Sequence, residues 1–327
     1  MKSSLEKKCS VFIRNRDMIK SVYKWENNYI VPVCAAVVCA KGVEADKEML
    51  LNARDLVNKK TGIFSNYRGN VKLPIMTMLA ADNSPEEKLA KSQAIYGKMK
   101  NHFFGSEYLT MVSTMLTDMI NADEAEKYAQ RGKAIYNLMK KEHPFLTTGE
   151  DSVFAVLMAF SEKTDNELID DMEQCFTILK KNFSDGDAVQ TMSHILALAE
   201  GTPEEKCGKV TALYQKITES GKKYSKYFEL AVLCAAALVT DDYDAFTADV
   251  IDADDYLAEQ EGYKGILGMD RKTRLMHAVM LTSSEYSSDS NADLAAMTGT
   301  LAMAAAQQAA MCAVIAASSA SAAATSN

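Results

Sequence analysis

The chain has 327 residues, 48% of them apolar, and a formal net charge of −8. Basic residues alternate with acidic ones instead of forming the lysine and arginine clusters that bind phosphate, which argues against a nucleic-acid partner. Only 15 Gly and 5 Pro are present, below the usual ~7% and ~5%, and the many Ala, Met, Leu, Lys and Glu residues favour helices.

Residues 1–27 are rich in charge and predict a single N-terminal capping helix. No apolar segment directly follows the first charges, so we do not expect a signal peptide. The apolar run at residues 30–40 is shorter than the ~20 residues that a membrane span needs.

A repeat dominates residues 28–290. Anchor residues recur in steps of 40, 40, 40, 38 and 42, at Leu56, Tyr96, Tyr136, Phe176, Tyr214 and Tyr256. A period of ~40 residues is typical of stacked helical hairpins. We therefore predict an all-α fold, a right-handed α-solenoid of about six helical hairpins that resembles HEAT or TPR repeats.

In each repeat, the sequence predicts a helix made almost entirely of apolar residues, followed by an amphipathic helix that carries the anchor residue. The predicted repeats cover residues 28–68, 69–104, 105–148, 149–185, 186–224 and 225–265, with a partial repeat at 266–290. The anchors are interpreted as packing between helices, because repeats preserve packing first.

Two matching motifs mark helix starts, Ser-Pro-Glu-Glu-Lys at residues 84–88 and Thr-Pro-Glu-Glu-Lys at 202–206. Ser or Thr at the N-cap accepts a backbone N–H, Pro tolerates the first helical position, and Glu at the third position can close a capping box.

An alanine-rich segment at residues 291–327 ends the chain and has no charge from Leu294 onward. It predicts either a packed terminal helix that fades into a disordered end, or a membrane anchor. Gln307 and Gln308 in the middle of the run, and the absence of flanking aromatic or basic residues, make a membrane anchor the less favoured alternative.

Seven cysteines are dispersed along the chain and none forms Cys-x-x-Cys. This usage is typical of reduced thiols buried in helices and predicts a cytoplasmic protein. The sequence contains no glycine-rich phosphate loop, no His-Glu-x-x-His and no Gly-x-Ser-x-Gly, so we predict no cofactor and no metal.

Three groups of polar residues are candidate binding sites. The loop at residues 142–151 gathers His143, Glu150 and Asp151 with Glu142. Carboxylates beside a histidine could bind a divalent metal or exchange protons. The alternative is a linker in which Glu150 or Asp151 caps the next helix.

The second group is the stripe Asp187, Gln190 and His194, whose spacing places all three on one helical face. The alternative is a partly exposed face with a hydrogen-bonded histidine. The third group, Arg68, Glu107 and Tyr108, lies on the loop edge beside the glycines that precede the apolar helices. This edge predicts either a binding rim or a solvated surface.

Several short stretches resemble a bacterial all-helical family, the domain of unknown function numbered four thousand and three. They are Arg-Gly-Asn at 68–70 with Leu-Pro at 73–74, Gly-Ser-Glu-Tyr-Leu at 105–109, Lys-Glu-His-Pro-Phe-Leu-Thr at 141–147, Gly-Glu-Asp at 149–151 and Ser-His-Ile-Leu-Ala-Leu at 193–198. The resemblance implies a helical fold in a bacterial cytosol and supplies no catalytic residue.

Two functional hypotheses follow. The first is a scaffold that binds another protein or peptide in a concave groove, as helical repeats typically do. The second is an enzyme or a metal- or ligand-binding protein that uses the 142–151 loop with Asp187 and His194.

Overall fold

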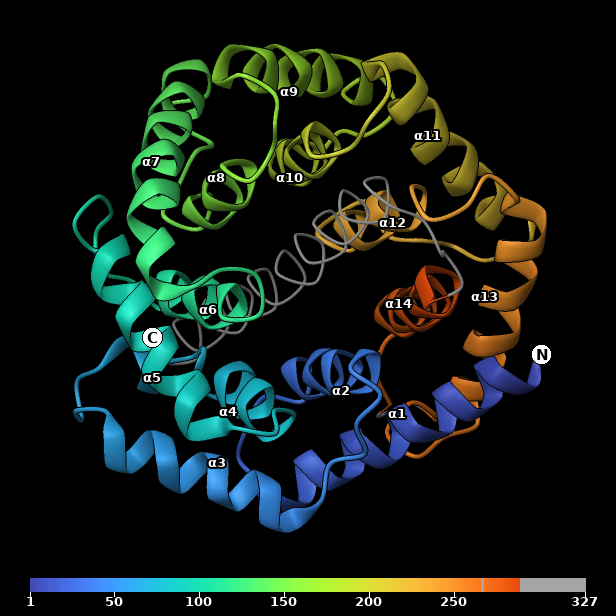
Figure 1. Ribbon diagram of the computed structural model, residues 1–327. Coiled ribbons are helices and arrows are strands. Elements are labelled where there is room, and N and C mark those ends of the chain that lie inside the picture. Colours follow the sequence, from blue (N-terminus) through green and yellow to red (C-terminus); the bar gives the residue numbers. More distant parts are fainter. Residues whose placement is uncertain (266–267, 289–327) are drawn as a thin grey trace, which may run out of the picture. The chain divides into compact units, whose positions relative to one another are not determined.

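The computed structural model describes residues 1–265 and 268–288, and within these ranges every regular element is an α-helix or a 3₁₀-helix, without a strand (Figure 1). The prediction of an all-α protein is therefore confirmed for the described part of the chain. The predicted segment at 291–327 lies outside the described residues, so its two alternatives stay predictions.

The helices alternate between a short apolar type and a longer amphipathic type. In chain order they are α1 (Ser3–Val22), α2 (Ile30–Ala40), α3 (Lys47–Lys60), η1 (Asn66–Arg68), α4 (Lys72–Ala80), α5 (Pro85–Met99), α6 (Glu107–Leu116), η2 (Ala122–Glu124), α7 (Ala125–Glu142), α8 (Ser152–Met158), α9 (Asp165–Leu179), α10 (Gly186–Ala197), α11 (Pro203–Glu219), α12 (Leu230–Ala236), α13 (Tyr243–Ala258) and α14 (Arg271–Ser288).

The described residues form two compact units. Unit 1 contains residues 1–13 and, from residue 162 on, the helices α9 to α14, whereas unit 2 contains residues 14–161 with α2 to α8. Helix α1 contributes its first part to unit 1 and its remainder to unit 2. The predicted domain boundaries at residues 27 and 290, which separate the capping helix, the repeat domain and the C-terminal segment, stay predictions.

The apolar helices are buried on all sides because apolar side chains cover almost their whole circumference. All of α2 except Ala40 is buried, and so is every residue of α8 and α12. The amphipathic helices bury one stripe each. The stripe recurs every 40 residues, with Ile95, Ile135 and Cys175 fully buried in α5, α7 and α9, followed one turn later by Met99, Met139 and Leu179.

The anchor tyrosines occupy a different place from the predicted one. Tyr96 and Tyr136 are only half-buried, and the core position belongs to the residue before each of them. Their rings contact the turn that precedes them along the stack, Tyr96 with Tyr67 at 5.7 Å between centroids and Tyr136 with Phe103 at 6.0 Å. The anchors therefore join successive turns, and the prediction that they pack between helix layers is corrected.

The closest helix pairs differ from the predicted grouping. In unit 2, α3 packs along α4, α5 along α6 and α7 along α8; in unit 1, α9 packs along α10 and α13 along α14 (Figure 1). From α3 to α10, each of these pairs joins an amphipathic helix to the apolar helix that follows it, and apolar helices also pack on one another, α2 on α4 in unit 2 and α10 on α12 in unit 1. The glycine-containing loops are consequently the turns of these hairpins.

The two matching capping motifs also differ. Thr202 accepts a hydrogen bond from the backbone N–H of Glu205 and completes a capping box at the start of α11. Ser84 makes no side-chain capping bond at α5, and its backbone N–H donates to Asp82 Oδ1 at 2.9 Å. The same motif therefore caps one helix and not the other.

Within unit 1 the start of the chain lies against its last described helices. Lys2 Nζ donates to Asp249 Oδ2 of α13 at 2.7 Å, Lys8 pairs with Glu285 of α14 at 3.0 Å, and the Phe12 ring lies 6.1 Å from that of His277. A linear stack of hairpins does not predict contact between its first and last helices.

Candidate functional site

Six of the nine predicted binding residues lie at the hairpin turns of unit 2. We call the turns at residues 61–71, 100–106 and 143–151, with the first residues of the helices that follow them, the turn edge. Arg68, Glu107, Tyr108, His143, Glu150 and Asp151 all belong to it. Hydrogen bonds between successive turns hold the edge together.

Glu107 connects the first two turns. Its carboxylate accepts a hydrogen bond from the backbone N–H of Asn70 at 2.7 Å. The same carboxylate lies so close to Gly69 that a Cβ built there would meet Glu107 Oε1 at 2.0 Å. A side chain at residue 69 would therefore displace the Glu107 carboxylate from its bond to Asn70, which gives glycine a reason at this position other than an unusual backbone angle.

Tyr108 connects the second and third turns, because its hydroxyl donates to Glu150 Oε1 at 2.8 Å. Asp151 closes the third turn on itself by accepting from the backbone N–H of Thr148 at 2.6 Å. Both carboxylates are thus already engaged by donors of the protein. Asp151 occupies the N-cap position of α8, but its side chain makes no capping hydrogen bond there.

Arg68 caps a helix end. Its guanidinium donates to the backbone oxygen of Thr61 at 2.6 Å, to the Thr61 hydroxyl at 3.0 Å and to the backbone oxygen of Asn58. These oxygens end α3, where a cation also interacts favourably with the helix dipole. His143 is the residue that follows the last turn of α7, and its backbone N–H donates to Met139 O at 2.9 Å.

The predicted stripe lies on α10 in unit 1. Asp187 is exposed, whereas Gln190 and His194 are buried, the histidine completely. The stripe therefore passes from solvent into the core within two turns, and Asp185, not Asp187, caps the helix by accepting from Ala188 N at 2.8 Å. The 142–151 loop belongs to unit 2, so a binding site that combines this loop with Asp187 and His194 stays a prediction.

Metal binding receives no support from the described residues. Over residues 1–265 and 268–288, no group of three or more His, Cys, Asp or Glu side chains has an arrangement that could hold an ion. Nor does any described helix combine the length and the apolar composition of a membrane-spanning segment.

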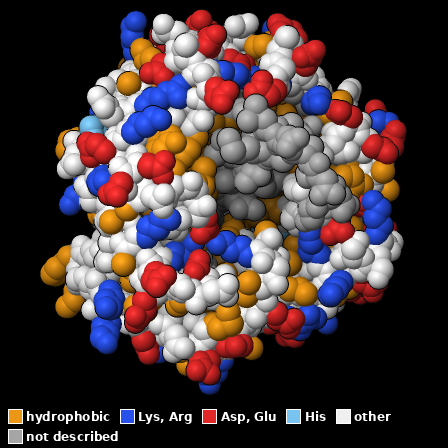
Figure 2. Space-filling model, viewed as in Figure 1, with side chains coloured by type: hydrophobic (Ala, Val, Ile, Leu, Met, Phe, Trp, Pro, Cys, Tyr) orange, Lys and Arg blue, Asp and Glu red, His pale blue; other side chains and the backbone are white. Residues whose placement is uncertain are grey.

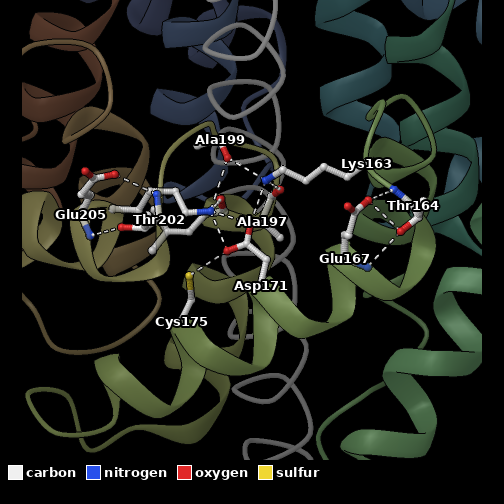
Figure 3. A network of polar contacts seen from close by, with 11 residues as sticks. Lys163, Thr164, Glu167, Asp171, Cys175, Ala197, Ala199, Thr202 and Glu205 are labelled. Atoms are coloured by element: carbon white, nitrogen blue, oxygen red, sulfur yellow. Dashed lines mark hydrogen bonds and ion pairs between the residues drawn. The ribbon is translucent and has the colours of Figure 1, made fainter.

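The sequence analysis missed a lysine–aspartate network in unit 1 (Figure 3). Asp171 on α9 accepts from Lys206 Nζ at 2.6 Å through both carboxylate oxygens and from Lys163 Nζ at 2.7 Å. Lys206 is the last residue of the Thr-Pro-Glu-Glu-Lys motif, yet its side chain is only 2% exposed. Such a charge needs a partner to be tolerated inside the protein.

Both ammonium groups also cap the end of α10. Lys206 donates to Leu196 O at 3.0 Å, and Lys163 donates to Ala197 O at 3.1 Å and to Ala199 O at 3.0 Å. Backbone oxygens at a helix C-terminus lack intrahelical partners and attract cations. The network therefore satisfies a helix end and a buried carboxylate together.

Equivalent helix ends in unit 2 use a simpler arrangement. Lys91 donates to Thr117 O at 2.7 Å after α6, and Arg131 donates to Ala159 O at 3.1 Å after α8. Residues 91, 131 and 171 are 40 apart in the sequence, so Asp171 reverses the charge at the repeated position. That reversal was the signal in the sequence that could have identified the network.

Cys175 lies beside the network, with its thiol 3.6 Å from Asp171 Oδ1. The Cys207 thiol donates to Cys175 O at 3.7 Å. Hydrogen bonding with the Cys207 thiol and burial raise the pKa of Cys175 above its usual range, and burial raises the pKa of Cys34 to about 12. The six described cysteines are all buried and none forms a disulfide, as the sequence predicted.

Comparison with known proteins identifies the family of the chain. The model of a family described as "Protein of unknown function (DUF4003)" matches residues 15–320. The chain belongs to this family. It is also 26% identical over 239 residues to the Bacillus subtilis (strain 168) protein named "Uncharacterized protein YeaA", a match that covers 70% of this chain and 72% of that protein. No solved structure matches the chain.

Proposed function

We propose that the chain is a scaffold, a HEAT- or TPR-like α-solenoid that works in the cytoplasm by binding another protein or a peptide. The observation that carries this proposal is the burial stripe that recurs every 40 residues in α5, α7 and α9. A core that repeats in this way leaves a repeated outer face, and helical-repeat proteins typically use such extended surfaces to bind partners.

The polar contacts of the turn edge support binding over catalysis. Arg68 is engaged by the end of α3, Glu107 by Asn70 of the preceding turn and Tyr108 by Glu150. These side chains hold the turns in place through contacts within the protein, which is a positioning role and not the paired acid and base of a catalytic site. Acidic and basic side chains are interleaved over the surface in Figure 2, a pattern suited to a polypeptide with both charges.

The test is to capture the partner by cross-linking in bacterial cells, and then to reconstitute the complex from the two purified proteins. We expect a stoichiometric complex whose affinity falls at least about fivefold when Glu107 is changed to Gln. The amide oxygen can still accept from Asn70 N, so the turn is preserved while the charge is lost.

Met119→Ala is the matched control, because Met119 is 39% exposed but lies on the turn between α6 and η2, away from the turn edge. Failure to reconstitute any complex, or turnover of a small molecule by the pure protein, would contradict a scaffold role. Equal effects of the two substitutions would remove Glu107 from the binding surface.

A further inference from the structure

Unit 2 leaves a series of aromatic side chains almost completely outside the fold. Trp25, Phe64, Phe104 and Phe145 are 98%, 100%, 97% and 96% exposed. They follow one another in the sequence at steps of 39, 40 and 41, the period of the repeat. Each lies in the loop before an apolar helix, and we call these four residues the aromatic tips.

The turns that carry the tips are held in place. Phe103 is buried against the Tyr136 ring, while its neighbour Phe104 is exposed. In the turn before it, Tyr67 is buried against Tyr96 while Phe64 is exposed. Each of these turns thus has an aromatic residue that anchors it and another that protrudes, so the protruding ring is presented by a fixed backbone.

Exposed lysines lie within five residues of each tip in the sequence. They are Lys24, Lys59, Lys60, Lys100, Lys140 and Lys141, all exposed and all close to the C-terminal end of an amphipathic helix. The acids nearest to the tips are Glu26, Glu107, Glu142, Glu150 and Asp151, and of these only Glu142 is exposed. The exposed charges next to the tips are therefore mostly basic, although the whole chain carries a net charge of −8.

The dipole of each amphipathic helix accounts for lysines at its C-terminus, but it does not account for aromatic rings in full contact with water. Large exposed apolar groups of this kind mark an interaction surface. A protein partner would need separate pockets at the spacing of the repeat. A lipid interface accepts aromatic rings wherever they protrude, and anionic headgroups attract the lysines beside them.

We propose that unit 2 docks on the surface of an anionic lipid bilayer through the aromatic tips Trp25, Phe64, Phe104 and Phe145 and the lysines beside them. The rings enter the headgroup layer and the ammonium groups pair with lipid phosphates. This is adsorption at a surface, in which no helix crosses the bilayer, and it does not depend on the protein partner proposed above.

The chain offers a direct probe, because Trp25 is its only tryptophan. Full-length protein is mixed with vesicles of equal parts phosphatidylglycerol and phosphatidylcholine, and with pure phosphatidylcholine vesicles. We expect sedimentation and a blue shift of tryptophan emission with the anionic vesicles only, both weakened by added salt. Absence of sedimentation and of a blue shift with anionic vesicles would overturn the proposal.

The triple variant Phe64→Ser, Phe104→Ser, Phe145→Ser should bind anionic vesicles at least about tenfold more weakly, with an unchanged urea midpoint because the rings are exposed. Met119→Ser is the control for an exposed apolar residue elsewhere in unit 2. A triple variant that binds vesicles like the wild type, or that loses only a protein partner, would refute lipid docking.

A second pair of variants tests the charges. Lys59→Gln with Lys141→Gln removes two lysines beside the tips, whereas Lys47→Gln with Lys127→Gln removes two exposed lysines from the first turns of α3 and α7. Both pairs change the net charge equally. We expect only the first pair to weaken binding to anionic vesicles, and equal effects would show that net charge alone, not this surface, governs the association.

Discussion

The buried Lys206–Asp171 pair allows a sharp test of how unit 1 is stabilised. Replacing Lys206 by Met preserves much of the side-chain volume and removes the ammonium group. The substitution deletes hydrogen bonds to both oxygens of Asp171 and to Leu196 O. We expect a marked loss of unfolding free energy, because two polar groups then lose a partner inside the protein.

The size of the loss follows from what remains around Asp171. Removing one member of a buried ion pair typically lowers the free energy of unfolding by roughly 3–5 kcal/mol. Here Lys163 stays 2.7 Å from Asp171 and its side chain is 25% exposed, so the carboxylate keeps one partner that water also reaches. We therefore expect a smaller loss of about 2–4 kcal/mol for Lys206→Met.

Lys209→Met is a closely matched control. Lys209 lies one turn further along α11 and pairs with Asp241 at 2.7 Å, but the two side chains are 40% and 81% exposed. An exposed pair of this kind contributes about 0–1 kcal/mol. Urea unfolding followed by circular dichroism gives the two midpoints, which are converted to free energies with a common slope.

The double variant Asp171→Leu with Lys206→Met separates the pair from the helix cap. Replacing both charges with apolar groups should recover part of the loss, because no uncompensated carboxylate remains. Losses for Lys206→Met and Lys209→Met that agree within about 0.5 kcal/mol would refute the reasoning, since burial would then have no effect on the pair.

Three further results are expected. Thr202→Ala should cost about 1 kcal/mol and Ser84→Ala distinctly less, measured by urea unfolding, because only Thr202 makes a capping bond; equal costs would contradict the assignment. Ile135→Ala should cost about 2–5 kcal/mol and more than Tyr136→Ala, since Ile135 is fully buried and Tyr136 half-exposed; the reverse order would return the tyrosine to the core. Burial of Asp118 opposes its ionisation, yet hydrogen bonds from two lysines lower its pKa, so its stabilisation is present above the unfolded pKa of about 4 and is lost as the pH falls below it. Acid titration of stability should therefore be shallower for Asp118→Asn, and an unchanged profile would exclude the effect.

Much of the fold could be predicted because the repeat is carried by residue types. The apolar runs of α2, α8 and α12 have no polar face to expose, so burial on all sides was the expected outcome. The site was less predictable. Arg68, Glu107 and Tyr108 were identified as residues of one edge, but their partners are backbone groups and side chains of other turns, which local spacing does not reveal.

The sequence by itself determined the helical content, the 40-residue period and the apolar stripe of each amphipathic helix, because propensity and periodicity act over one or two turns. Tertiary structure decided which lysine of two matching motifs meets which carboxylate. It also decided which of the adjacent and chemically identical residues Phe103 and Phe104 is buried. The Tyr136 ring receives Phe103, and Phe104 is therefore left to the solvent and to whatever surface the protein meets.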